Sequence, residues 1–184
     1  MILKQQQEIL WSNLNYKDFW AIRGKRPATK WSKDKQGRVR KILESIDFDS
    51  VLEVGCGDGE FSKLLLERTK NVTGIDLSLE RIKASPLRIT IHEDFLKAPF
   101  NNQKFDLVCC SHVLLHIKPG DVIGFYNKMK LLSNKHILLI EPDMFLYDSL
   151  EWDVMNFPHD YNRLFGPFEM DSVEPRVKAF IQHY

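Results

Sequence analysis

Three glycines at alternate positions, Gly55, Gly57 and Gly59, follow directly after a short apolar run at residues 51–54. The apolar run predicts a buried strand, and the leucine-rich residues 60–69 predict a helix after the glycines. Glycine permits a tight backbone turn and removes the side chain that would block a ligand at a strand end. Because three glycines in five residues serve no packing purpose, we interpret the segment as a strand–turn–helix unit that binds a ligand.

Strand and helix patterns alternate along the rest of the chain. Further strands are expected at residues 71–75, 87–91, 105–110 and 136–140. Helices are expected at residues 38–46, 79–84 and 121–132. Two closing strands are expected at residues 168–173 and 177–183. This order predicts an α/β fold, a doubly wound sheet with an antiparallel edge.

Three further segments carry weaker patterns. The first 20 residues predict a short amphipathic helix, and residues 159–165 predict another short helix. Residues 143–157 are rich in large apolar side chains and are expected to pack, as a helix or a loop, against the strand ends.

Chain length and net charge limit the classes of protein to which this sequence can belong. The 184 residues suit one domain, and 26 lysines and arginines stand against 25 aspartates and glutamates. The near-zero balance argues against a protein that coats nucleic acid with its whole surface.

The three cysteines, Cys56, Cys109 and Cys110, are odd in number, and two are adjacent. They exclude a disulfide framework and favour a reducing compartment. The first residues contain no apolar signal-peptide core, and no apolar run approaches the roughly 18 residues that span a bilayer. We therefore expect a cytoplasmic protein without a membrane partner.

The glycine spacing restricts the ligand. A dinucleotide-binding turn needs G-x-G-x-x-G, but position 60 is glutamate, and the Gly-Lys-Ser/Thr of a P-loop is absent. The spacing therefore excludes nicotinamide-dependent oxidoreduction.

The segment Glu53-Val-Gly-Cys-Gly-Asp-Gly59 resembles the first motif, E/D-x-G-x-G-x-G, of the class I S-adenosylmethionine (SAM)-dependent methyltransferases, and it matches each fixed position. The resemblance implies that SAM lies against this loop. The cofactor-binding residues that it implies here are Glu53, Gly55, Cys56, Gly57 and Gly59.

The resemblance continues at the next two strands. Asp76, followed by Leu77, matches the family's acidic residue that holds both ribose hydroxyls of SAM, and a carboxylate can accept from two hydroxyls at once. Asp94 and Phe95 match the acidic and aromatic pair beside the adenine.

The fourth match begins at Phe105 and runs to Ile117, and it is similar to a segment common among enzymes that methylate small molecules. It implies that Ser111 and His112 line the cofactor. The family fold implied is a seven-stranded sheet of order 3-2-1-4-5-7-6 with strand 7 antiparallel.

The motifs name no catalytic residue, because the methyl group of SAM is already activated and alignment is the main task. His112 and His116 are four apart and would share a helix face; each is a candidate general base or a structural residue. His159 is a further candidate base or a turn residue. No metal site is expected, since His112–His116 lacks the glutamate of H-E-x-x-H.

The basic stretch at residues 17–41 holds ten lysines and arginines against two aspartates. It could bind phosphate groups of RNA or of a metabolite, or it could be a solvated segment. In the resembling enzymes such a segment forms a lid, and Arg23 or Lys30 would then meet the SAM carboxylate.

We therefore expect residues 1–41 to form a basic lid or arm and residues 42–184 to form the SAM-binding domain. The expected function is methyl transfer from SAM to an oxygen or nitrogen of a small molecule, with S-adenosylhomocysteine (SAH) as the product. An RNA or protein methyltransferase and a non-catalytic SAM-binding partner remain alternatives. Nothing in the sequence indicates the oligomeric state.

Overall fold

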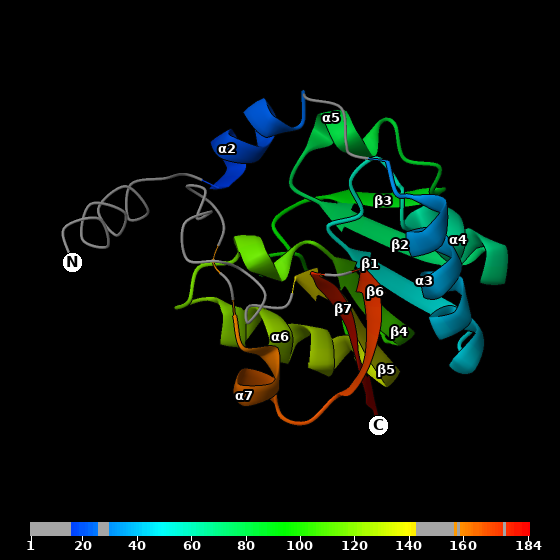
Figure 1. The fold of residues 1–184 in the computed structure, drawn as a ribbon. Helices are drawn as coiled ribbons and strands as arrows, with labels where there is room; N and C mark the ends of the chain where they lie inside the picture. Colours follow the sequence, from blue (N-terminus) through cyan, green and yellow to red (C-terminus); the bar gives the residue numbers. More distant parts are fainter. Residues whose placement is uncertain (1–15, 26–29, 143–156, 158, 175) are drawn as a thin grey trace.

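The computed structural model describes residues 16–25, 30–142, 157, 159–174 and 176–184. Within this part the chain forms one mixed sheet with helices on both faces (Figure 1). The segment expected as an apolar helix or loop falls on residues 143–156, which lie outside the described residues, as does most of the amphipathic helix expected at the N-terminus.

The sheet has seven strands in the order β3-β2-β1-β4-β5-β7-β6. Their bounds are β1 (Ser50–Val54), β2 (Asn71–Asp76), β3 (Ile89–His92), β4 (Phe105–Ser111), β5 (Ser133–Pro142), β6 (Glu169–Glu174) and β7 (Val177–His183). Strands β1 to β5 pair in parallel, and β7 is antiparallel to both β5 and β6. The expected strand order and the antiparallel strand 7 are confirmed.

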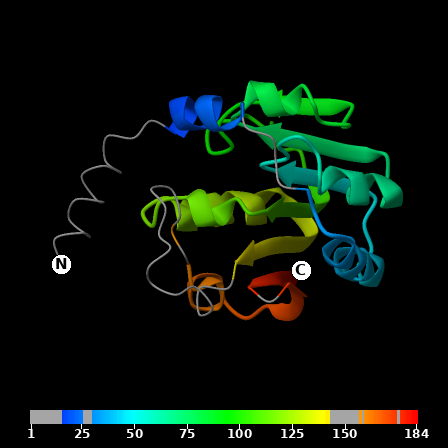
Figure 2. The ribbon, with the colours of Figure 1, turned by 45° about the horizontal axis from the view of Figure 1, so that its top comes forward.

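The helices form two layers around this sheet. Their bounds are α2 (Tyr16–Arg23), α3 (Lys33–Ser45), α4 (Ser62–Arg68), α5 (Leu79–Ile82), the 3₁₀ turn η1 (Leu114–His116), α6 (Val122–Leu132) and α7 (Tyr161–Phe165). Helices α3 and α4 cover one face of the sheet and α6 covers the other (Figures 1 and 2). Among the described residues, no helix has the length and apolar character needed to cross a membrane.

Strand β4 shows how the residue pattern builds both layers. Leu107 and Cys109 pack into the core beneath α3 and α4, whereas Val108 and Cys110 pack into the core beneath α6. A strand with apolar side chains on both faces is typical of a parallel sheet covered on both sides. All three cysteines are buried and free, in agreement with the expected absence of disulfides.

Helix α3 is present as expected, but it begins at Lys33, five residues before the predicted start at residue 38, so the predicted start was wrong. The reason is the N-cap Ser32, whose Oγ accepts a hydrogen bond from the backbone N–H of Lys35 at 3.1 Å. The boundary expected between residues 41 and 42 lies within α3. The division into a lid segment and a SAM-binding domain stays a prediction.

Candidate active site

A cavity of about 690 Å³ lies at the carboxyl ends of the parallel strands. This edge is where ligands bind in open α/β sheets. Ten of the eleven residues predicted to bind the cofactor line the cavity: Glu53, Gly55, Cys56, Gly57, Asp76, Leu77, Asp94, Phe95, Ser111 and His112. The eleventh, Gly59, lies in the same loop but does not line it.

The glycine loop turns at the end of β1, where the N–H of Gly55 donates to the carbonyl of Ile75 at 2.7 Å. Gly59 has a φ of +88°, and a Cβ there would lie 2.1 Å from Cδ of Pro86. Gly59 therefore serves close packing, contrary to the expectation that these glycines have no packing purpose. Gly57 has a φ of +51°, but a Cβ there would meet its first neighbour, Nη1 of Arg81, at 3.5 Å. Gly57 lines the cavity, and a Cβ added there would make only ordinary contacts with its neighbours.

Asp76 ends β2 directly beside this loop. Its Oδ2 accepts from the N–H of Gly57 at 2.9 Å, and its Oδ1 accepts from the N–H of Ser78 at 2.7 Å. Burial raises the pKa of Asp76 above its ordinary value, although these hydrogen bonds oppose the rise. Each carboxylate oxygen has a second lone pair, so Asp76 can still accept from a ligand hydroxyl.

Asp94 and Phe95 lie at the end of β3, next to β2. Oδ1 of Asp94 accepts from the N–H of Leu96 at 3.0 Å. Phe95 is buried and packs against Phe125, with ring centroids 4.7 Å apart. The residues Glu93, Asp94 and Phe95 therefore all line the cavity after the end of β3.

Glu53 is enclosed beneath the loop and accepts a hydrogen bond from Oγ of Ser62 at 2.5 Å. Burial raises its pKa to about 8. A carboxyl group with a pKa in this range can carry a proton at neutral pH and then donate a hydrogen bond.

Ser111 and His112 end β4. His112 has a φ of +55°, an uncommon conformation for a residue other than glycine, and its Nδ1 lies 3.1 Å from Oγ of Ser111. Burial lowers the pKa of His112 to about 3, so the imidazole is neutral. His116 lies in η1, so the two histidines do not share one helix face as predicted.

His159 does not line the cavity. It is buried, and its Nε2 donates to the carbonyl of Ile117 at 2.9 Å. This contact fits the structural alternative rather than the catalytic one. Among the described residues, no three His, Cys, Asp or Glu side chains form a metal-binding group.

The sequence reasoning missed Glu141, which is fully buried at the end of β5. Its carboxylate accepts from the N–H groups of Val113 and Leu114 at 2.8 and 3.0 Å and thereby orders the start of η1. Burial raises its pKa to about 7. A charged residue that ends a fully apolar run, as Glu141 does, is the signal that could have identified it.

Helix α2 forms another wall of the cavity. Tyr16 lines the cavity, and its hydroxyl accepts from the N–H of Lys118 at 2.7 Å. Trp20, which also lines the cavity, packs edge-on against His116 with ring centroids 4.9 Å apart. Lys30 lines the cavity as well, whereas the side chain of Arg23 lies outside the described part of the chain.

Residues 52–130 match a protein family described as "Methyltransferase domain". The glycine loop, Asp76, Asp94 and the end of β4 all lie within the matched residues.

Among curated proteins, this chain is similar to the ubiquinone biosynthesis O-methyltransferase of Hydrogenovibrio crunogenus. The two are 25% identical over 167 residues, covering 77% of this chain and 66% of that protein. A second relative of the same name, from Psychrobacter arcticus, is 28% identical over 67% of this chain. The chain spans about 56% to 66% of the length of these relatives.

Among solved structures, the fold is similar to that of phosphoethanolamine N-methyltransferase 1 of Haemonchus contortus, in complex with phosphoethanolamine and SAH. The TM-score is 0.68 at 18% identity, covering 91% of this chain and 47% of that one. At this level of identity the likeness establishes a shared fold.

Proposed function

We propose that this chain transfers the methyl group of SAM to an oxygen or nitrogen atom of a small-molecule acceptor and releases SAH. The observation that carries the proposal is the meeting of Gly57, Asp76 and Asp94 around one cavity, at the ends of three adjacent strands. The names of the curated relatives and the SAH bound in the similar structure support it.

The residues present fit SAM. The open side of Gly57 would admit the cofactor against the loop, and Asp76 would accept from its ribose hydroxyls. Asp94 would accept from the adenine amine, and Phe95 would cover the ring. When bound, SAM supplies a methyl group on a positively charged sulfur, ready for transfer.

The protein's part in the reaction is positioning. Walls from α2, η1 and the strand ends would hold the reacting groups in line. The neutral imidazole of His112 adds no positive charge to the cavity. It can accept a hydrogen bond from an acceptor hydroxyl, because a neutral imidazole keeps one nitrogen lone pair.

Calorimetric titration with SAM and SAH tests this proposal. Wild type should bind both, and Asp76→Ala should bind at least about tenfold more weakly, because a charge-assisted hydrogen bond contributes about 1.5–3 kcal/mol. The matched control is Glu80→Gln, on the exposed side of α5 near the same strand end. Absence of SAM and SAH binding to wild type would overturn the proposal.

The ion pairs made by the basic stretch at residues 17–41 favour a small-molecule acceptor over a nucleic acid. Arg38 and Arg40 form ion pairs with Asp34 and Glu67. These two charges are compensated within the fold and are less available for the phosphates of a nucleic acid. The three free, buried cysteines support location in the cytoplasm, a reducing compartment.

A further inference from the structure

The cavity wall contains a lysine that the cofactor contacts proposed above do not use. Lys35, in the first turns of α3, lines the cavity and is only 4% exposed. Its Nζ lies 3.3 Å from Oε2 of Glu174 and 4.5 Å from the ring centroid of Trp31. A buried ammonium is costly to desolvate, even when paired. Because Lys35 lines the cavity, an anionic group of a bound ligand could help to compensate this cost.

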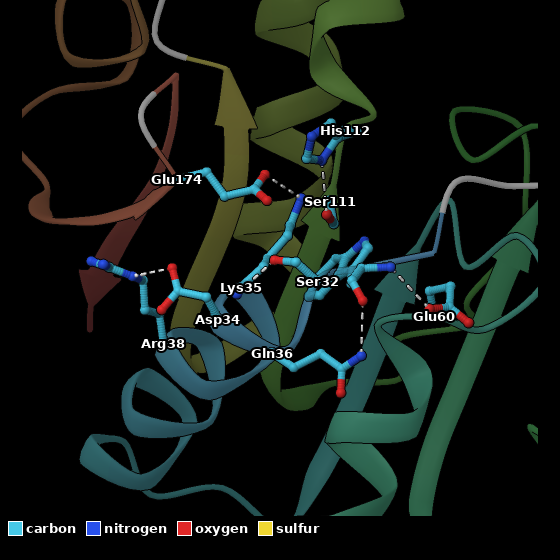
Figure 3. A network of polar contacts seen from close by, with 10 residues as sticks. Ser32, Asp34, Lys35, Gln36, Arg38, Glu60, Ser111, His112 and Glu174 are labelled. Carbon is cyan, nitrogen blue, oxygen red and sulfur yellow. Dashed lines mark hydrogen bonds and ion pairs between the residues drawn. The ribbon is translucent and has the colours of Figure 1, made fainter.

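Lys35 lies at the opposite end of the cavity from the predicted adenosine contacts. Asp76 and Asp94 end β2 and β3, on one side of β1, whereas Lys35 contacts the end of β6, on the other side. In Figure 3 the Lys35 ammonium points toward Glu174 and lies beside Ser111 and His112. The adenosine contacts therefore leave this end free for the rest of the cofactor and for the methyl acceptor.

The Lys35 ammonium keeps the capacity to bind a further group. An ammonium has three N–H donors, and within the described residues one carboxylate, that of Glu174, contacts it. The Glu174 side chain is 33% exposed, at the rim of the cavity and at the end of β6. A carboxylate carried by a ligand could therefore share or take over this contact.

Aromatic side chains also line the cavity. Trp31 lies beside Lys35 and stacks on Phe61 with ring centroids 5.6 Å apart, whereas Phe19 and Trp20 line the cavity from α2. Such walls suit an apolar or aromatic molecular body.

We propose that Lys35 binds a carboxylate or phosphate group of the methyl acceptor, and that Glu174 occupies Lys35 as an internal carboxylate when no acceptor is bound. The acceptor class is thus a small aromatic or apolar acid. This inference rests on the proposed methyltransferase function, since it assigns the other end of the cavity to the adenosine part of SAM.

The two partners of the ion pair give opposite predictions. Lys35→Met removes the binding group, so it should weaken binding of an anionic probe at least about tenfold. Glu174→Gln removes the competing carboxylate, so it should bind the probe as tightly as wild type or more tightly. The matched control is Lys33→Met, an exposed lysine on the same helix, which should bind as wild type does.

The experiment is calorimetric titration of the SAH-saturated protein with benzoate, phenyl phosphate and neutral benzyl alcohol. Wild type should prefer an anionic probe, and the tighter of the two anions identifies the carboxylate or the phosphate source. This comparison needs no variant, so it stands even if Lys35→Met does not fold. SAH binding and thermal melting of each variant report an intact fold.

The inference is overturned if wild type binds SAH but shows no preference for either anion. It is also overturned if Lys35→Met and Glu174→Gln lose anion binding equally, because an ion pair that only supports the structure predicts that result. Failure of wild type to bind SAH would overturn both this inference and the proposed function.

Discussion

Two glutamic acids, Glu53 and Glu141, are enclosed at the ends of β1 and β5, and both have raised pKa values. Glu53 has a single hydroxyl partner, whereas Glu141 accepts from several backbone N–H groups. The pKa of Glu53 rises to about 8 and that of Glu141 to about 7. Burial is the main cause in both, and hydrogen bonds to the charged form oppose it.

Glu53→Gln is expected to remove a pH-dependent loss of stability. In the unfolded chain Glu53 releases its proton near its ordinary pKa of 4.5, whereas the folded protein keeps it up to about 8. Between these values the folded state binds more protons, so its free energy of unfolding falls as pH rises, by at most about 1.4 kcal/mol per pH unit. Urea unfolding across this pH window should show wild type losing stability relative to the variant.

Glu67→Gln is the control, because Glu67 is exposed and its pKa is lowered by Arg40. Parallel stability curves for wild type and Glu53→Gln would contradict the prediction.

At the scale of single residues, the sequence predicts those site residues whose role follows from a motif. Asp76 and Gly57 are of this kind, and both line the cavity. The role of Lys35 could not be predicted, because it depends on burial and on a neighbour far along the chain. For Glu141, only its position at the end of an apolar run could have drawn attention to it, and its contacts to η1 could not be predicted.

In the glycine loop between β1 and α4, two glycines with similar backbone conformations have different surroundings. Gly57 and Gly59 both have positive φ, but only Gly59 is closed in by a neighbour, Pro86. The two glycines should therefore respond differently to an added methyl group.

Gly59→Ala should chiefly destabilise the fold, by about 2–4 kcal/mol, since strain at positive φ is joined by a clash with Pro86. Gly57→Ala should cost only about 1–2 kcal/mol of strain but weaken SAM binding. Thermal melting and calorimetry of both variants separate the two effects. Gly120→Ala, with no neighbour within 4 Å of the added carbon, is the control. Equal melting temperatures for Gly57→Ala and Gly59→Ala would refute this distinction.

Elements with strong periodicity, such as β4 and α6, agree with their expected bounds within about a residue. Helix α3 and the turn η1 do not. The first turn of α3 is polar, and its start is set by the Ser32 cap. The start of η1 is set by hydrogen bonds to Glu141. Neither segment therefore has the apolar periodicity from which a helix is predicted.

At the scale of the whole molecule, the sheet separates the core into two parts. Ile42 packs in the part beneath α3 and α4, and Ile137 packs in the part beneath α6. Because each part is well packed by itself, small volume changes in one should not be felt in the other.

Ile42→Val and Ile137→Val are each expected to destabilise the protein by about 0.5–1.5 kcal/mol. Their double variant should lose the sum of the two, within about 0.5 kcal/mol, because the sites share no partner. Urea unfolding of the single and double variants measures this. A coupling well above that margin would show that the sheet transmits packing changes between its faces.

The global strand order was predictable because the motifs resemble a family with a fixed topology. The packing of α3 against β6 was not, since no pattern within either segment specifies the contact between Lys35 and Glu174. Long-range pairs of this kind arise only once the closing hairpin is in place.

Strand β7 lies between β5 and β6, although β6 precedes it in the chain. During synthesis, β6 therefore leaves the ribosome before its partner exists, and the edge of β5 stays open. The closing region cannot be completed while residues 177–183 are still inside the exit tunnel. A stalled nascent chain would expose an unpaired strand edge of the kind that aggregates or recruits chaperones. This fold finishes its sheet only after translation has passed β7.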